Sequence, residues 1–294
     1  MGRIHFLFFG FLLYLLGFLL AAEYNNLFDI TKFLLGYLPF SLAQLSVSYS
    51  NDYFDQQSDL TSNKTIFSGG SHILVEHPEL QSTALKIAIL LLIFSGISLI
   101  AFTIAFEYSF WLILFGILGG LLGWFYTAPP LKLSYRGFGE IATMIAVGLM
   151  MPGMGFFVSA GSISYPFIFL ITPLSLFGLF FIITVQLPDF ESDIISKKRN
   201  IVIRLGRQKA KFLLIISSLA ASFYLLSLHI FRSFQFSIIL VFILSFLPII
   251  SSAYFILKPD TRETIVKNVL INMVSLIVLI IGFNIVLIIE YILS

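Results

Sequence analysis

The sequence contains no cysteine, which excludes disulfide bonds, thiolate metal sites and cysteine nucleophiles. Its four histidines, His5, His72, His77 and His229, show no spacing typical of a zinc site. Charged residues make up only 11% of the 294 residues, against about 25% in a soluble domain. Because so few charges cannot cover a soluble surface, the chain is expected to be an integral membrane protein.

Apolar residues are abundant instead, at 59% of the chain. A membrane-spanning helix needs about 20 of them in a row, and nine runs qualify: 4–22, 30–50, 83–104, 109–127, 140–160, 166–187, 210–230, 235–257 and 267–292. The first run is longer than the apolar region of a typical signal peptide, and Ala21-Ala22-Glu23 is a poor cleavage site. The sequence therefore predicts an all-α protein with nine transmembrane helices, in which residues 1–294 form one transmembrane domain.

The distribution of basic residues indicates how these helices are oriented. If the nine runs cross the membrane alternately, 15 of the 17 Lys and Arg residues fall on the side of the N-terminus, and only Lys32 and Arg232 fall on the other. Basic loops face the cytoplasm. The N-terminus is therefore expected inside and the C-terminus outside.

The first cluster of acidic residues follows the second run. If the helix continues through it at 100° per residue, Asn51, Asp52, Asp55 and Asp59 lie on one face. The C-terminal end of a helix disfavours anions, and no Lys or Arg lies within the cluster. A distant basic residue or a metal ion is expected to neutralise it; the simpler alternative is a solvated helix end capped by Asn and Asp.

A second acidic pair follows the sixth run, on the same expected side of the membrane. Asp189 and Asp193 are one helical turn apart. Hard oxygen ligands of this kind suit Mg²⁺, whose coordination is often completed by substrate phosphates. The two motifs are expected to face one another and to bind a diphosphate through two or more Mg²⁺ ions. The alternative is that Asp189 follows a helix break at Pro188 and that Asp193 pairs with Lys197.

Two other features bear on a diphosphate. Basic residues follow the fourth and sixth runs, although such loops are basic in any membrane protein: they are Lys132, Arg136, Lys197, Lys198, Arg199 and Arg204. The loop Ser68-Gly69-Gly70-Ser71 either presents backbone N–H groups to phosphate or is a plain turn.

Together these residues resemble the UbiA superfamily of intramembrane prenyltransferases. Residues 51–59 are similar to its first motif, N-D-x-x-D-x-x-x-D, and residues 189–193 to its second, D-x-x-x-D. Residues 198–206 resemble its G-K-x-T-L-x-V-R-L-G segment, with Lys197 in place of Gly and Asn200 in place of Thr. Residues 126–132 resemble its Tyr-Ser-x-Pro-Pro loop.

The resemblance implies nine helices around a central cavity and Mg²⁺-dependent transfer of a prenyl group from a polyprenyl diphosphate to an aromatic acceptor. The implied metal ligands are Asn51, Asp52, Asp55, Asp59, Asp189 and Asp193. The implied diphosphate-binding residues are Lys132, Lys198, Arg204, Lys64 and Ser68. The implied catalytic residues are Asp55, Asp189, Asp193, Lys132 and Tyr126.

The acceptor class is less closely defined. The first motif and the later Phe67-Ser68-Gly69-Gly70-Ser71 most resemble the menaquinone-type branch, which converts 1,4-dihydroxy-2-naphthoate to demethylmenaquinone. Asn63-Lys64-Thr65-Ile66-Phe67 departs from the Asn-Lys-Pro-x-Arg-Pro run of the branch that uses geranylgeranylglyceryl phosphate, and 4-hydroxybenzoate remains open.

Alternatives from other classes fit less well. A cation-coupled transporter is disfavoured, because its ion site lies near the bilayer midplane. No array typical of a CDP-alcohol phosphotransferase is present. Beyond the two substrates and the lipid bilayer, we expect no nucleic-acid partner and no obligatory protein partner.

Overall fold

The computed structural model describes residues 1–25, 27–62, 64–231 and 237–293, and every regular element in those ranges is helical. The longer helices are α1 Ile4–Asn25, α2 Ile30–Phe54, α5 Gln81–Ala105, α6 Trp111–Trp124, α8 Gly139–Ile145, α9 Met151–Ala160, α10 Tyr165–Gln186, α13 Arg207–Ile230, α14 Ile238–Leu244, α15 Phe246–Ile256 and α16 Arg262–Leu293. The short ones are α3 Gln56–Asp59, α4 Ile73–Glu76, η1 Pro78–Leu80, α7 Leu133–Arg136, η2 Ala146–Met150, α11 Phe190–Ile195 and α12 Ile201–Leu205. The prediction of an all-α protein is confirmed.

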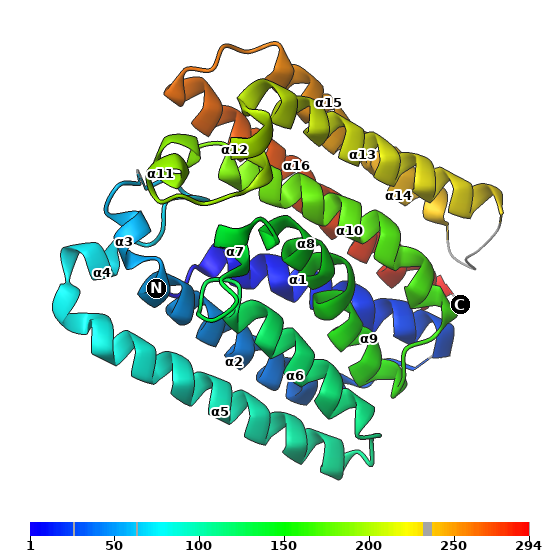
Figure 1. Ribbon diagram of the computed structural model, residues 1–294. Coiled ribbons are helices and arrows are strands. Elements are labelled where there is room, and N and C mark those ends of the chain that lie inside the picture. Colours follow the sequence, from blue (N-terminus) through cyan, green and yellow to red (C-terminus); the bar gives the residue numbers. More distant parts are fainter. Residues whose placement is uncertain (26, 63, 232–236, 294) are drawn as a thin grey trace.

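In these described ranges, eight helical stretches are long and apolar enough to cross a membrane, and each coincides with an expected span. The remaining expected span, 109–127, contains only α6, whose 14 residues extend for about 21 Å, short of a hydrocarbon core of about 30 Å. The helix ends at Trp124 because the chain turns there, ahead of Pro129-Pro130. The predicted count of nine crossings is therefore not confirmed, although the N-terminus and the end of α16 lie at opposite ends of the molecule, as an odd number requires (Figure 1).

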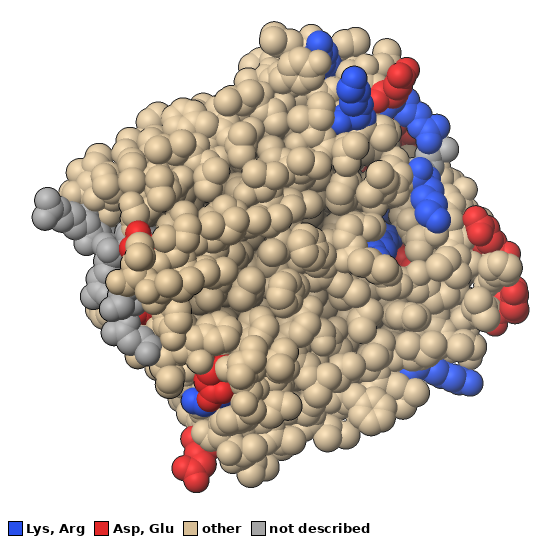
Figure 2. Space-filling view, turned by 180° about the vertical axis from the view of Figure 1, so that it is seen from behind, with Lys and Arg blue, Asp and Glu red and all other residues tan. Residues whose placement is uncertain are grey.

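The short helices gather at one end of the bundle. Helices α3, α4, α7, α11 and α12 all lie at the end where the chain begins (Figure 1). On the face drawn in Figure 2, Lys and Arg concentrate at one end of the molecule, beyond a broad uncharged belt. Large apolar side chains of several helices are exposed, such as Phe94 of α5, Phe223 of α13 and Ile250 of α15, as expected for a surface in contact with lipid.

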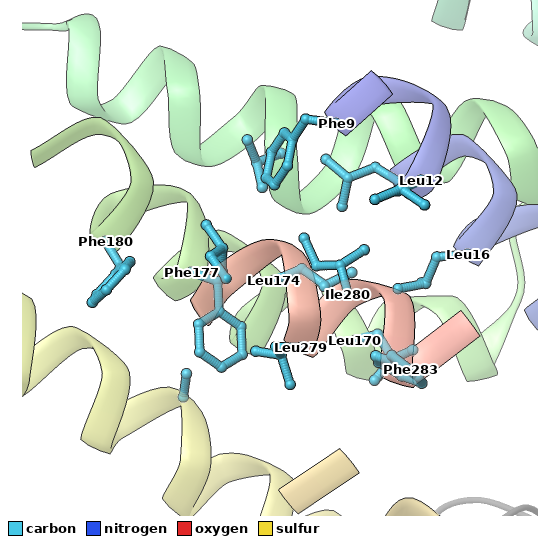
Figure 3. Close-up of a cluster of buried hydrophobic side chains, with 14 of the residues drawn as sticks. Phe9, Leu12, Leu16, Leu170, Leu174, Phe177, Phe180, Leu279, Ile280 and Phe283 are labelled. Atoms are coloured by element: carbon cyan, nitrogen blue, oxygen red, sulfur yellow. The ribbon is translucent and has the colours of Figure 1, made fainter. Parts of the chain in front are cut away.

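The core lies where α1, α10 and α16 meet. Figure 3 shows Phe9, Leu12 and Leu16 of α1 facing the side chains of α10 and α16. Helix α1 also packs closely on α9. A Cβ atom at Gly155 would overlap the backbone of Tyr14, so the close approach of these helices requires glycine there.

Two residues of the sequence analysis lie outside the described ranges. They are Asn63, next to the predicted phosphate-binding Lys64, and Arg232, one of the two basic residues expected on the outer side. The first two residues of the expected span 235–257 also lie outside the described ranges.

Candidate active site

A cavity of about 400 Å³ lies inside the bundle, and its lining residues come from the part of the sequence between Arg3 and Asn200. Its lining along α2 runs from Pro39 to Asp55, which corresponds to roughly 24 Å of helix. Acidic residues of both motifs line one end, and Phe40, Leu99 and Phe115 line the apolar part. Among the described lining residues, the charged side chains are Arg3, Asp55, Asp59, Asp189, Asp193 and Lys198. The cavity thus combines a charged end with a long apolar pocket.

The first motif lies where α2 ends. The helix is interrupted at Asp55 and resumes as α3, so the continuous helix assumed from the sequence is broken at that residue. Asn51 accepts a hydrogen bond at Oδ1 from the Thr127 hydroxyl at 2.8 Å. Asp55 accepts one from the Tyr135 hydroxyl at 2.6 Å. Thr127 and Tyr135, the latter in α7, therefore fix the first two side chains of the motif that line the cavity.

Asp52 has a different environment from its neighbours in the motif. Its side chain is 2% exposed and is absent from the cavity wall. The guanidinium group of Arg3 lies 3.3 Å from Asp52 Oδ1, and the chain's amino group lies 3.6 Å from Oδ2. The distant basic residue expected for this cluster is Arg3, and it neutralises Asp52.

The second motif follows the end of α10. Asp193 Oδ1 lies 3.0 Å from Lys198 Nζ, and Asp193 Oδ2 accepts a hydrogen bond from the Asn200 amide at 2.6 Å. Asp193 therefore pairs with Lys198, and the pairing with Lys197 considered in the sequence analysis is absent. Asp189 Oδ2 accepts a hydrogen bond from the Gly69 N–H group at 3.2 Å, and among the described residues its buried Oδ1 has no hydrogen-bond partner.

The loop Ser68–Ser71 connects the two motifs. Gly69 and Gly70 have φ values of 78° and 72°, a region that favours glycine. The Gly69 N–H group binds Asp189, and a Cβ atom at Gly70 would overlap the carboxylate of Asp59. Only glycine fits between the motifs, so this segment is a structural part of the site, with Ser68 also in the cavity wall.

Burial shifts the protonation of the acidic end. Burial, with the nearby charges of Asp55 and Asp52, raises the pKa of Asp59 to about 7. Burial, with the charge of Asp193, raises the pKa of Asp189 to about 7. Burial opposes the charge of Lys198, but the carboxylates of Asp55 and Asp193 outweigh it and raise its pKa above the usual value. The site holds an excess of carboxylates that one lysine does not neutralise.

A comparison with protein families identifies the chain. Residues 10–276 match the model of the UbiA prenyltransferase family. The chain belongs to the UbiA prenyltransferase family. The family expected from the two acidic motifs is thus confirmed.

Similar proteins agree with this assignment. The chain is 28% identical over 210 residues to a 1,4-dihydroxy-2-naphthoate octaprenyltransferase of Bacillus subtilis (strain 168), an alignment that covers 71% of this chain and 64% of that relative. The fold resembles that of a UbiA homologue from Aeropyrum pernix K1, with a TM-score of 0.70, 14% identity and coverage of 93% and 96% of the two chains. It also resembles a UbiA homologue from Archaeoglobus fulgidus bound to GPP and Mg²⁺, with a TM-score of 0.64, 15% identity and coverage of 96% and 99%.

The UbiA cavity brings together most, but not all, of the residues predicted from the sequence. Its wall contains Asn51, Asp55, Asp59, Ser68, Tyr126, Asp189, Asp193 and Lys198. Lys64, Lys132 and Arg204 are exposed and lie outside the wall. A role of these three in diphosphate binding stays a prediction.

Several residues at the site were missed by the sequence analysis. Arg3, Thr127, Tyr135 and Asn200 each bind a motif side chain. The contacts of Arg3, Thr127 and Tyr135 join positions 49 to 80 apart, so no local spacing indicates them. Asn200 lies seven positions after Asp193, a separation that does not match a helical turn. Gln186 also lines the cavity; its position three residues before Asp189, on the same helical face, is the only signal in the sequence.

The donor atoms fit a hard divalent cation. The acidic end offers carboxylate and amide oxygens from Asn51, Asp55, Asp59, Asp189 and Asp193, and Asp189 Oδ1 has no hydrogen-bond partner among the described residues. Among the described residues, no three His, Asp or Glu side chains converge on a single point. Mg²⁺ is usually held by one or two carboxylates and completed by water and phosphate oxygens, so its binding does not require such a group of three.

Proposed function

We propose that this protein transfers a prenyl group from a polyprenyl diphosphate to an aromatic acceptor, with 1,4-dihydroxy-2-naphthoate as the acceptor. The observation that carries the proposal is the cavity: two acidic motifs meet at one end of an apolar pocket. The acceptor is inferred from the Bacillus subtilis relative. Because the alignment covers 64% of that relative, acceptor and chain length both require direct measurement.

The charged end would bind the diphosphate. Asn51, Asp55, Asp59, Asp189 and Asp193 would hold Mg²⁺, which supplies positive charge to the leaving diphosphate when it is bound. Use of Mg²⁺ is supported by the Archaeoglobus fulgidus homologue of the same fold, which binds GPP and Mg²⁺. Lys198 would add a cation from the protein. Asp52 forms an ion pair with Arg3, so we propose that it stabilises the position of the motif and does not bind the metal.

The apolar part would bind the prenyl chain and exclude water. In the reaction, the bond between C1 and the bridging oxygen breaks, and its electron pair leaves with the diphosphate. A ring carbon of the acceptor gives an electron pair to C1. With 1,4-dihydroxy-2-naphthoate the ring then releases CO₂, so the prenyl group replaces the carboxylate and the product is demethylmenaquinol. A dry pocket walled by Phe40, Phe115 and Met154 protects the cationic C1 from water.

The position of the charges bears on the transporter alternative. The charged residues of the described cavity wall belong to the acidic motifs, Arg3 and Lys198, and these lie at the end of the bundle where the short helices gather. An ion path through the bundle would need ionisable groups deeper in the membrane. We also propose that residues 1–294 act as one domain, with the charged end toward the cytoplasm, the N-terminus inside and the C-terminus outside, because the basic residues cluster on that side.

The test is a reaction panel with purified protein and Mg²⁺. Octaprenyl and geranylgeranyl diphosphate are combined with 1,4-dihydroxy-2-naphthoate, 4-hydroxybenzoate or geranylgeranylglyceryl phosphate, and products are identified by mass spectrometry. We expect a prenylated naphthalene product and diphosphate release, both lost on addition of a chelator. If folded protein produces no prenylated acceptor from any pair, the proposed function is wrong. A product from another acceptor alone would overturn the acceptor assignment.

A further inference from the structure

Gln186 is a polar residue of the cavity that the mechanism above does not use. It is the last residue of α10 and lines the cavity. The backbone carbonyl oxygen of Gln186 accepts a hydrogen bond from the backbone N–H of Asp189, which places Gln186 one turn from the second acidic motif. It lies between the charged end and the apolar pocket, where the reacting carbon of a bound prenyl diphosphate would be.

The buried side chain of Glu140 fixes the orientation of the Gln186 amide. Glu140 Oε1 lies 2.8 Å from the backbone N–H of Ile201 and 3.0 Å from Gln186 Nε2. A backbone N–H can only donate, so Glu140 Oε1 must be an acceptor. The group that Gln186 presents to it is therefore NH₂, and the amide cannot rotate without losing this bond.

The oxygen of Gln186 then has no partner. Gln186 Oε1 is buried and makes no hydrogen bond in the described structure. A buried acceptor without a donor is unfavourable, and a ligand that supplies the donor is bound preferentially. An ionised prenyl diphosphate carries no O–H or N–H group, whereas a hydroxylated aromatic acceptor carries one or more.

We infer that Gln186 determines acceptor specificity by accepting a hydrogen bond from a ring hydroxyl of the aromatic substrate, and that Glu140 is its positioning residue. This inference rests on the proposed function and adds to it the residue that distinguishes hydroxylated acceptors. A bond at this point would also hold the ring against the end of the pocket where C1 of the donor lies.

A second glutamine offers a matched control. Gln44 also lines the cavity, donates its amide N–H to Phe6 O at 3.0 Å, and has a buried Oε1 without a partner. It lies on α2, seven residues before Asn51, which is roughly 10 Å farther from the acidic end. Its amide is packed against Gly10 of α1. The two glutamines thus have the same amide group, but Gln44 lies farther from the acidic end of the cavity.

The experiment compares Gln186→Met with Gln44→Met, two substitutions of similar size. With 1,4-dihydroxy-2-naphthoate, Gln186→Met should lower kcat/KM for the acceptor about tenfold, as expected for one lost hydrogen bond. In Gln186→Met, the KM for the prenyl diphosphate and the Mg²⁺ dependence should change less than about twofold. Gln44→Met should leave the acceptor kcat/KM within the same factor.

Acceptors that lack one hydroxyl identify the contact. The probes are 1-hydroxy-2-naphthoate and 4-hydroxy-2-naphthoate. For one of them the wild-type enzyme should lose about tenfold relative to the diol, and Gln186→Met should lose nothing further, because the same bond is already missing. Glu140→Met should raise KM for the acceptor alone, and Glu140→Gln, which keeps an acceptor oxygen, should restore it.

Four results would overturn the inference while leaving the proposed function intact. Three of them are an unchanged acceptor kcat/KM in Gln186→Met, an equal loss in Gln44→Met, and equal discrimination of the two analogues by wild type and Gln186→Met. A change confined to the donor KM or to Mg²⁺ dependence would also overturn it, since Gln186 would then contact the diphosphate or metal-bound water. A wild-type enzyme that prenylates no aromatic acceptor would overturn both.

Discussion

The two acidic motifs resemble one another in sequence but differ in what holds their carboxylates. In the first, Asp52 is paired with Arg3 and turned away from the cavity. In the second, Asp193 is paired with Lys198, and both side chains line the cavity. Each motif therefore has one carboxylate paired with a basic residue. Asp52 in the first motif does not line the cavity, whereas Asp193 in the second does.

Carboxylates with similar spacing in the two motifs are therefore expected to have different roles. Each motif retains one acidic side chain with few protein partners, Asp59 in the first and Asp189 in the second, and each has a pKa raised to about 7 by burial and neighbouring carboxylates. Those two residues gain most from a bound cation. The comparison predicts that Asp55 and Asp59 of the first motif and Asp189 of the second bind Mg²⁺ together with phosphate oxygens of the substrate, and that Lys198 of the second motif adds a cation from the protein.

The largest effect should come from removing a carboxylate that faces the cavity. Asp55→Ala and Asp189→Ala are each expected to abolish turnover, with losses above about 10³-fold, because the developing charge of the diphosphate loses its cation. Both variants should stay folded, since both side chains line the cavity and neither belongs to the hydrophobic core. Product formation is measured beside the thermal unfolding midpoint in detergent. Near-normal turnover of either variant would show that the metal site is assigned wrongly.

Lys198→Met tests the cation of the second motif and should have the next largest effect. We expect turnover to fall about 10²-fold, in the range found for a lost charge-stabilising group. Lys197→Met is the matched control, because Lys197 is adjacent and exposed and makes no ion pair in the described structure. Similar losses in both variants would mean that the general basic charge of this loop matters, and not the contact with Asp193.

The raised pKa values predict a pH dependence that distinguishes the metal-free and Mg²⁺-bound protein. Asp59 and Asp189 bind protons more tightly in the folded protein than at the ordinary value of 3.8. In the metal-free protein, their contribution to stability is fully present below about pH 4 and is lost as the pH rises through about 7. Mg²⁺ must displace these protons, so its apparent affinity should increase about tenfold per titrating group between pH 6 and pH 8.

Thermal unfolding with and without Mg²⁺ at several pH values measures this effect. The increase in the unfolding midpoint on addition of Mg²⁺ should be larger at pH 8 than at pH 6. Asp189→Asn should reduce this pH dependence, because it removes one of the two titrating groups. A Mg²⁺ effect that is the same at both pH values would contradict the protonated state of the metal-free site.

Much of the fold was predictable because it depends on local composition. The apolar runs identify the helices, and the spacing of the carboxylates identifies both motifs. The length of α6 was not predictable, since the turn after Trp124 ends the helix while the apolar residues continue to Tyr126. The second motif shows the same limit: α11 ends at Ile195, and Lys197 adopts a φ of 56°, which brings Lys198, not Lys197, to Asp193.

The supporting contacts of the site depend on tertiary structure. Arg3 reaches Asp52 across 49 positions of sequence, and Tyr135 reaches Asp55 across 80. No periodicity connects such residues. The sequence therefore predicts which residues carry the chemistry, whereas the structure is needed to distinguish a carboxylate that lines the cavity from one that supports it.

Asp52→Asn tests that distinction and should have the smallest effect. Asparagine keeps a hydrogen bond to Arg3 but loses the ion pair, and Arg3 is partly exposed, so the unfolding midpoint should fall by only a few degrees. Turnover should fall less than about fivefold, because Asp52 does not line the cavity and contributes through the position of its neighbours. If Asp52→Asn is as inactive as Asp189→Ala, then Asp52 must leave Arg3 and bind the metal when substrate is present. The two motifs would then be equivalent in function, and their difference would belong to the metal-free state alone.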